Sequence, residues 1–251
     1  MYLGLDLGTS GLKGVLIDDT QQVLAEATAP LTVSRPRDGW SEQSPADWIA
    51  AVEIVLRALS DHDLSAIRGI GLSGQMHGAV LLDAADDVLR PCILWNDTRA
   101  HVEAAALDAD PQFRAITGNI VFPGFTAPKL SWVRQNEPAV FAKIAKVLLP
   151  KDYLRLWLTG DHVTEMSDAA GTSWLDTGAR DWSDALLAAA GLGREHMPRL
   201  VEGSDISGYL RPELVARFGL SSDVIVAGGG SDNAAAGIGA GVVKGGQAFV
   251  S

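Results

Sequence analysis

The first thirty residues alternate between apolar and polar positions in the manner of β-strands. Two such runs, residues 2–7 and 12–17, are separated by the short turn at residues 8–11, and a third run, VLAEATA, begins at Val23. Period-two alternation between turn residues is typical of half-buried strands joined by hairpins. The pattern therefore predicts an antiparallel meander at the start of the chain.

A change to helical spacing follows the meander. Ser44 is a suitable N-cap for a helix over residues 45–59, because serine side chains accept hydrogen bonds from the first free backbone N–H groups of a helix. Apolar side chains recur there at intervals of three and four, which predicts one buried face. The residues expected on that face are Ala46, Trp48, Ile49, Val52, Val55 and Leu56.

The middle of the chain predicts two further strands and then mostly helices. The strand-like runs lie at residues 67–75 and 78–86, on either side of a polar turn. Residues 98–158 are mainly helical by their period, with one helix ending before Pro138 and another ending at Gly160. Proline cannot continue a helix, and glycine is common just past a helix C-terminus.

Near its end the chain predicts a buried strand, a glycine turn and a helix of small residues, within DVIVAGGGSDNAAAGIGAG at residues 223–241. A meander followed by alternating strands and helices indicates an α/β domain, with a mixed sheet and helices on both faces. Three polar clusters, at residues 6–13, 73–77 and 228–233, fall at strand ends. Ligands of such sheets gather at strand ends, so the clusters are expected to share one site.

Charge and cysteine content limit the class of protein. The net charge of −11 opposes long-range attraction to polyanions, which excludes nucleic acid as the main partner. The single cysteine, Cys92, has no internal disulfide partner and lies in the apolar run CILW, so we expect a buried thiol. No apolar run approaches the roughly 20 residues that span a bilayer, and residues 1–18 read as strands rather than a leader. A cytoplasmic protein without membrane partners is the expectation.

Several catalytic motifs are missing from the sequence. Five scattered histidines and one cysteine give no zinc spacing. There is no G-x-S-x-G nucleophile elbow and no G-x-x-x-x-G-K-[ST] phosphate loop. If the protein handles ATP, it does so with another arrangement.

Asp232 is the strongest candidate for chemistry. It follows three glycines and stands near the first turn of the predicted helix, where the helix dipole favours an ionised carboxylate. An ionised carboxylate within reach of a hydroxyl can act as a general base. The glycines would leave room for a ligand to approach the backbone. The alternative is that Asp232 or Asn233 caps the helix.

The opening hairpin is a candidate phosphate site. Backbone N–H groups of a glycine turn, with the hydroxyls of Thr9 and Ser10, suit a phosphate, while Asp6 could hold a metal ion and Lys13 supply positive charge. Ordinary turn chemistry around Gly8 explains the same residues without any ligand.

The segment SGQMHG places Gln75 and His77 between two apolar strands, and both side-chain types can bind the hydroxyls of a sugar or polyol. A structural histidine is the alternative.

A second polar segment, WNDTR, begins at Trp95 and could stack on and hydrogen-bond a sugar. We expect Asn96 or Asp97 instead to cap the helix that follows. Lys129, in FTAPKLSW, could reach a ligand, although a lysine on a helix usually faces water.

Together these segments resemble the FGGY carbohydrate kinases, which belong to the actin and hexokinase type of ATPase with a ribonuclease H-like fold. The matching motifs occur in the family's order: GLDLGTSGLKGVLID, SGQMHG, ILWNDTR, TGNIVFPGFTAPKLSWVRQNEP, LPKDYLRLWLTG, EMSDAAGTSWLD and GGGSDNAAAGIGAG. The resemblance is greatest to members that act on D-xylulose. It implies ATP-dependent phosphorylation of D-xylulose or a related pentulose, with ATP and Mg²⁺ required.

The resemblance also implies roles for individual residues. Asp232 would be the base that accepts the proton of the attacking hydroxyl, and Asp6 would act through a water-bound Mg²⁺ and the transferring phosphate. The implied sugar contacts are Gln75, Met76, His77, Trp95, Asp97 and Asn233. The implied phosphate contacts are Gly8, Thr9, Ser10 and Lys13.

Family members continue into a second domain that completes the ATP site. We therefore expect residues 1–240 to form the N-terminal, sugar-binding domain and residues 241–251 to begin the next one, with poor activity for this chain alone. Other readings remain open: a ribulokinase or another pentulose or polyol kinase, a non-catalytic sugar-binding module, or a structural domain that works through partners. The sequence leaves open whether the chain forms a homodimer.

Overall fold

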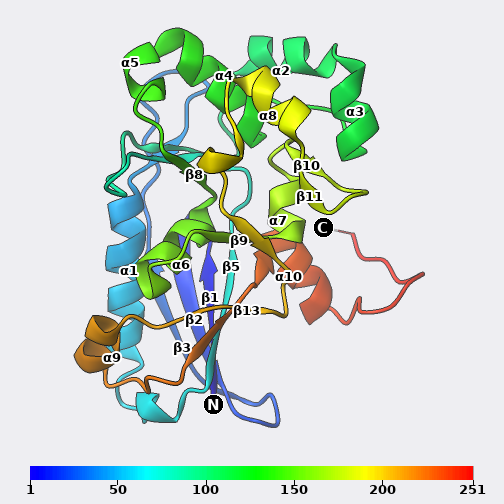
Figure 1. The fold of residues 1–251 in the computed structure, drawn as a ribbon. Coiled ribbons are helices and arrows are strands. Elements are labelled where there is room, and N and C mark those ends of the chain that lie inside the picture. The colour runs from blue at the N-terminus through cyan, green and yellow to red at the C-terminus, as the bar shows by residue number, and fades with distance from the viewer. Residues whose placement is uncertain (251) are drawn as a thin grey trace.

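A computed structural model describes residues 1–250 of the chain (Figure 1). Its largest element is a seven-stranded mixed sheet in the order β13-β14-β5-β1-β2-β3, with β15 also beside β5. The strands are β1 (Tyr2–Leu7), β2 (Gly11–Ile17), β3 (Val23–Pro30), β5 (Gly69–Gly74), β13 (Ile206–Tyr209), β14 (Ile225–Ala227) and β15 (Gly230–Ser231). Strands β1, β2 and β3 are antiparallel, which confirms the predicted meander, whereas β5 runs parallel to both β1 and β14.

One face of this sheet is packed against two helices. Along β1 the side chains of Leu3, Leu5 and Leu7 are buried, in alternation with exposed positions. They join a core with α1 (Pro45–Ala58), which packs on β2 and β3, and α6 (Pro150–Thr159), which packs on β5. Burial of this apolar face is the main force holding the sheet to its helices.

The other face of the sheet is covered only in part. Helix α10 (Asp232–Gly239) contacts β5 and β15, and the short helix α7 (Met166–Ala170) contacts β15. Helices therefore lie on both faces, as predicted, with α1 on one side of the sheet and α10 on the other (Figure 1). Asp6 and the other exposed positions of β1 open onto this second face.

A second core lies beyond the sheet, among the helices drawn at the top of Figure 1. These are α2 (His101–Asp108), α3 (Pro111–Thr117), α4 (Thr126–Asn136), α5 (Pro138–Phe141) and α8 (Asp184–Ala190). Strand β6 (Val80–Leu82), from the second predicted run, pairs with β8 (Lys146–Leu148) and not with the main sheet. The two strands predicted on either side of the polar turn therefore lie in different sheets.

The remaining elements are short. They are β4 (Glu42–Gln43), β7 (Cys92–Ile93), β9 (Val163–Glu165), β10 (Leu175–Asp176), β11 (Asp181–Trp182), β12 (Arg199–Val201), α9 (Pro212–Phe218) and two 3₁₀ turns, Leu64–Ala66 and Arg194–His196.

Local sequence signals set several helix ends. Helix α1 begins directly after Ser44, although the serine side chain makes no capping hydrogen bond. Gly160 ends α6 in the left-handed conformation, with φ 85°, and α4 ends before Glu137, after which Pro138 begins α5. The predicted buried face of α1 is correct except at Ala46, which is exposed, and at Ile49, which is only partly buried, while Ala51 is buried as well.

Cys92 is fully buried, and burial raises the pKa of its thiol to about 12, which confirms its predicted packing role. No helix within residues 1–250 combines the length and the apolar character that crossing a bilayer requires.

Candidate active site

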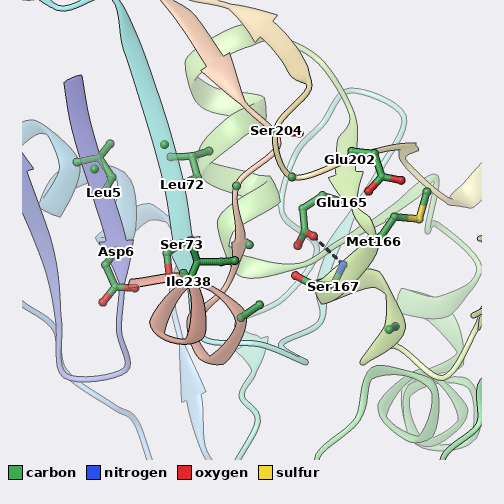
Figure 2. Close-up of a pocket in the computed structure, with 18 of the residues that line it drawn as sticks. Leu5, Asp6, Leu72, Ser73, Glu165, Met166, Ser167, Glu202, Ser204 and Ile238 are labelled. Atoms are coloured by element: carbon green, nitrogen blue, oxygen red, sulfur yellow. Dashed lines mark hydrogen bonds between the residues drawn. The ribbon is translucent and has the colours of Figure 1, made fainter. Parts of the chain in front are cut away.

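A cavity of about 900 Å³ lies over the partly covered face of the main sheet (Figure 2). Asp6 and Ser73 lie at paired positions on neighbouring strands at its floor, and Ser167 of α7 lines another side. Gly230 and Ala234, which flank Asp232, also line it. At least one residue of each polar cluster that the sequence places at strand ends lines this cavity, whereas Gln75, His77 and Asp232 are not among its lining residues.

Asp232 is the first residue of α10 and is half-buried beside this cavity. Its Oδ1 accepts a hydrogen bond of 2.7 Å from the backbone N–H of Asn233. Burial raises the pKa of the Asp232 carboxyl above its ordinary value, and the negative charge of Asp6 raises it further. A carboxylate with a raised pKa takes up a proton more readily, which suits a general base.

Two of the three glycines before Asp232 are required by close contacts between backbone segments rather than by space for a ligand. A Cβ at Gly229, whose φ is 75°, would lie 2.1 Å from the carbonyl oxygen of Leu72, and a Cβ at Gly228 would lie 2.1 Å from that of Glu202. These two glycines therefore let β14 and β15 pass close to neighbouring backbone. Gly229 and Gly230 both line the cavity, but of the three glycines only Gly230 would accept a Cβ without a close contact, which fits the expectation of room for a ligand.

The β1–β2 hairpin offers free donors at the edge of the sheet. Within residues 1–250, the backbone N–H groups of Gly8, Thr9 and Ser10 make no hydrogen bond. The Thr9 hydroxyl donates to Oε1 of Gln75 at 3.1 Å and accepts from the indole N–H of Trp95 at 3.0 Å. Gln75 and Trp95 thus fix the hairpin through these two hydrogen bonds, while its N–H groups remain available to bind an anion.

Asp6 and Lys13 stand opposite each other in the β1–β2 register, both exposed. The Asp6 side chain makes no hydrogen bond or ion pair with any of residues 1–250, so its carboxylate is available to a cation. The Lys13 ammonium pairs with the Glu26 carboxylate at 2.9 Å, and both side chains are about half exposed. Such exposed pairs contribute little, so Lys13 can exchange this partner for another anion.

His77 is held on several sides. Its backbone is left-handed, with φ 67°, and its ring contacts Phe125 at 4.5 Å between centroids. Burial, and then the charge of Lys129, lower the pKa of His77 to about 4, so the ring is neutral at pH 7. Nδ1 lies 2.9 Å from the carbonyl oxygen of Gly171 and therefore donates to it. The remaining ring nitrogen, Nε2, is then an acceptor without a partner among residues 1–250.

Because the pKa of His77 is lowered in the folded chain, the free energy of unfolding depends on pH. Histidine in the unfolded chain takes up a proton below about pH 6.5, whereas folded His77 stays neutral until about pH 4. Stability present above pH 6.5 is therefore lost as the pH falls toward 4, by up to about 3 kcal/mol. Urea unfolding between pH 7 and 4 measures this loss, and His77→Asn is expected to flatten the slope.

His101→Asn, at an exposed histidine, is the matched control and should keep the wild-type slope. Asparagine suits position 77 because it tolerates a positive φ. Identical slopes for the wild type and His77→Asn would contradict the neutral state assigned to His77.

Asp97 is buried in an ion-pair network rather than at a helix start. Its Oδ2 accepts from the backbone N–H of Ser41 at 2.6 Å, and its two oxygens accept from the Arg99 side chain at 2.9 and 2.7 Å. The N-cap position of α2 is Ala100, without a side-chain cap, so the capping expectation for Asn96 or Asp97 is wrong. Through these bonds Asp97 fixes the loop that carries Trp95.

The sequence does not predict a buried cluster of charged side chains, although its residues lie in two of the quoted motifs, LPKDYLRLWLTG and EMSDAAGTSWLD. The Lys151 ammonium lies 2.7 Å from Asp152, 3.4 Å from Glu165 and 3.1 Å from Asp168, and all four side chains are buried. Burial alone would lower the pKa of Lys151, but these three carboxylates raise it above its ordinary value. Burial raises the pKa of Asp168, which limits the excess of negative charge. Charged residues inside the apolar motif LPKDYLRLWLTG were the available signal.

This cluster fixes the elements around the cavity. Glu165 caps α7 by accepting from the backbone N–H groups of Ser167 and Asp168 at 2.6 and 2.9 Å. Buried Arg155 donates to the carbonyl oxygens of Ala227 and Gly228 at 2.7 and 2.6 Å, directly before the glycine turn. The position of Asp232 therefore depends on α6 and α7.

Helix α7 links the two predicted ligand clusters. Near its start, the Ser167 hydroxyl accepts from the backbone N–H of Ser231 at 3.3 Å, next to Asp232. Just past its end, Gly171 binds His77. Four residues of helix rise about 6 Å, so α7 brings the Asp232 and His77 clusters within the reach of one small ligand.

No three histidine, cysteine or carboxylate side chains within residues 1–250 gather in a way that could hold a metal ion. The free Asp6 carboxylate, beside the hairpin N–H groups, nevertheless suits Mg²⁺, which is commonly bound by one or two carboxylates together with waters and substrate phosphates.

Comparison with known proteins agrees with this geometry. The profile of the FGGY family of carbohydrate kinases, N-terminal domain, matches residues 1–239. The chain is 54% identical over 253 aligned residues to the xylulose kinase of Escherichia coli strain K12, covering all of this chain and 52% of that protein. The chain thus spans about half the length of such relatives.

Solved structures give the same result. A crystal structure described as a "xyloylose kinase" from Brucella ovis has a TM-score of 0.96 and 66% identity, covering 97% of this chain and 51% of that one. A gluconate kinase from Lactobacillus acidophilus has a TM-score of 0.88 and 27% identity, covering 92% of this chain and 48% of that one. The fold is therefore shared by kinases named for different sugars.

Proposed function

Because the chain belongs to the FGGY family of carbohydrate kinases, we propose that it is the sugar-binding half of a kinase that converts D-xylulose and ATP into D-xylulose 5-phosphate and ADP. The observation that carries this proposal is the half-buried carboxylate of Asp232, with its raised pKa, beside a cavity floored by Asp6. The names of the E. coli and Brucella ovis relatives support the choice of sugar.

Asp232 is the general base of the proposed reaction. The terminal hydroxyl of the sugar attacks the γ-phosphorus of ATP, the bond from that phosphorus to the ADP oxygen breaks, and the hydroxyl proton passes to Asp232. The raised pKa of Asp232 favours this transfer. Phosphoryl transfer depends mainly on positioning and charge neutralisation, so correct placement of Asp232 matters as much as its basicity.

The β1–β2 hairpin is the proposed phosphate site. Its free N–H groups at Gly8, Thr9 and Ser10 would donate to phosphate oxygens, and Lys13 would add a positive charge. Asp6 would hold Mg²⁺ through water, and the ion would neutralise charge on the phosphates.

The proposed sugar site lies between the hairpin and α7. His77 offers Nε2 as an acceptor to a sugar hydroxyl, with the partly exposed Met76 side chain beside it. Trp95, 48% exposed, presents its ring, and Asn233 follows the base. Gln75 and Asp97 act indirectly. Gln75 is hydrogen-bonded to Thr9 of the hairpin, and Asp97, which is hydrogen-bonded to Ser41, fixes the loop that carries Trp95.

Residues 1–240 are proposed as one domain, which agrees with the end of α10 at Gly239 and of the family match at 239. We place the adenosine pocket in the second half of a longer protein. The domain predicted to begin at residues 241–251 would belong to that half as well. Residue 251 lies outside the described residues. We expect this chain alone to bind sugar weakly and to transfer phosphate poorly.

Titration calorimetry of the isolated chain tests the sugar site. D-xylulose is expected to bind at least tenfold more tightly than D-ribulose, L-arabinose or glycerol, since His77 and Asp232 present fixed polar groups to one arrangement of hydroxyls. ATP with Mg²⁺ is expected to bind much more weakly than D-xylulose, because the chain supplies only part of the phosphate site.

A preference for D-ribulose would favour a ribulokinase, and one for glycerol a polyol kinase. Binding of none of these sugars would contradict the proposal that this half carries the sugar site.

A further inference from the structure

Lys129, in α4, is fully buried and lies within the second core rather than at the surface. None of the carboxylates in residues 1–250 forms an ion pair with it. Buried lysines are rare unless they are paired, because desolvating an ammonium group is costly. The prediction that Lys129 faces water is wrong, and the burial calls for another role.

The Lys129 ammonium binds two main-chain carbonyls. Its Nζ lies 2.7 Å from the carbonyl oxygen of His77 and also donates to the carbonyl oxygen of Gly124. The Thr126 hydroxyl, one turn earlier in α4, donates to the same His77 oxygen at 3.2 Å. Two side chains of α4 therefore hold one carbonyl group of the SGQMHG segment.

His77 needs such support because its backbone is unfavourable. A positive φ is costly for a residue with a Cβ, and here φ is 67°. A Cβ at Gly171 would lie 2.4 Å from Cε1 of His77, which shows how closely the ring is packed. With Nδ1 bound to Gly171 and the carbonyl bound to α4, Nε2 is the remaining ring atom free to bind a ligand.

We propose that Lys129 is a positioning residue, which holds the His77 main chain in its left-handed conformation so that Nε2 faces the sugar. This inference rests on the proposed function for its ligand, but the placement of His77 by Lys129 holds in the ligand-free chain. Lys129 does not touch the sugar, because its side chain is fully buried and its ammonium already binds two carbonyl oxygens.

The surroundings of Lys129 support a positioning role over a charge-pairing one. Cys92, Asp97 and Arg99 are the other titratable groups that influence it, and Asp97 is already bound to Arg99. Burial lowers the pKa of Lys129 to about 7, well below its ordinary value, so the two carbonyl contacts are better explained by hydrogen-bond donation than by a paired charge. Both a neutral amine and an ammonium can donate to two carbonyls, and this donor function is what position 129 supplies.

The test compares Lys129→Met with Lys146→Met in the isolated chain. Methionine keeps the length of the side chain but removes its donors. Lys146 is the control because its Nζ also donates to a backbone carbonyl, that of Glu195 at 2.5 Å, at a more exposed position that is far along the chain from His77. Both variants lose a lysine–carbonyl contact, whereas only one loses a contact to His77.

Two measurements are needed on each variant. The first is the ¹⁵N and ¹H spectrum of the His77 ring without ligand, in which wild type is expected to show a neutral ring with a protected Nδ1–H. Lys129→Met is expected to lose that protection, and Lys146→Met to keep it. The second is calorimetric binding of D-xylulose, for which Lys129→Met is expected to raise Kd about tenfold and Lys146→Met less than twofold.

An unchanged ring spectrum in folded Lys129→Met would overturn the proposal, whatever the sugar affinity. If wild type binds no sugar, the proposed function fails while the ring spectrum still decides the role of Lys129. If Lys129→Met does not fold, Lys129→Gln replaces it, because the shorter glutamine side chain removes the ammonium from the two carbonyl oxygens while keeping a polar group. That variant is expected to lose Nδ1–H protection, and an unchanged ring spectrum in folded Lys129→Gln would also overturn the proposal.

Discussion

Asp232→Asn is expected to lower kcat for phosphoryl transfer on the order of 10³-fold while changing the Kd for D-xylulose less than about threefold. Asparagine has the shape of aspartate and can still accept the hydrogen bond from the Asn233 N–H, so the start of α10 should be retained. It cannot take up a proton from the sugar hydroxyl. The loss should therefore fall on the chemical step and not on binding.

The measurement uses a hybrid kinase, in which residues 1–251 of this chain are joined to the second half of the E. coli relative. The 54% identity over the whole of this chain makes that junction reasonable. Asp223→Asn, at an exposed carboxylate a few residues earlier, is the matched control and should keep wild-type kcat. Equal losses of sugar affinity and kcat in Asp232→Asn would point to a structural role for Asp232.

Lys151→Met is expected to lower the free energy of unfolding of the chain by about 3–5 kcal/mol, because removal of one partner leaves buried charges uncompensated. Only Arg155 would then remain near the carboxylates of Asp152, Glu165 and Asp168. A loss of this size corresponds to a fall in Tm of about 10 °C for a chain of this length. Urea unfolding and a thermal scan measure it.

Two further variants test the cause of that loss. Lys143→Met, at an exposed lysine, should change stability by less than about 0.5 kcal/mol. Asp168→Asn in the Lys151→Met background should restore part of the loss, since it removes one of the unpaired charges. If Lys151→Met is no less stable than Lys143→Met, the buried cluster does not hold α6 and α7 together.

The elements with strong local signals were predictable from the sequence. Alternation in residues 2–7 and 12–17 gave the meander because one side of those strands is buried and the other is not. Gly160 marked the end of α6 because a left-handed residue closes that helix. The strand, turn and helix around Asp232 were predictable for the same reason, since each depends on neighbours in the chain.

Features that depend on distant contacts were not predictable in this way. Lys129 has the sequence context of a surface lysine, and only the folding of α4 against the SGQMHG segment buries it. Asp97 has the sequence context of a helix cap. In the fold it instead accepts a hydrogen bond from the backbone N–H of Ser41, which is far away in the sequence. The pairing of β6 with β8 likewise joins segments more than sixty residues apart.

The same distinction between local signals and distant contacts applies to the site residues. Asp6 and Asp232 could be assigned to the same edge of the sheet because the ends of neighbouring parallel strands meet there. The left-handed backbone of His77 and the role of α7 as a link could not, because periodicity carries no information on either. Recognition of the family motifs supplied the roles, and the contacts supply the physical reasons for them.

Formation of D-xylulose 5-phosphate by the hybrid kinase tests the central claim most directly, because every residue of the proposed sugar site then comes from this chain. The account predicts that kcat/KM for D-xylulose exceeds that for D-ribulose, L-arabinose and glycerol by at least about tenfold. Phosphorylation of glycerol as efficient as that of D-xylulose, by a folded hybrid, would contradict it.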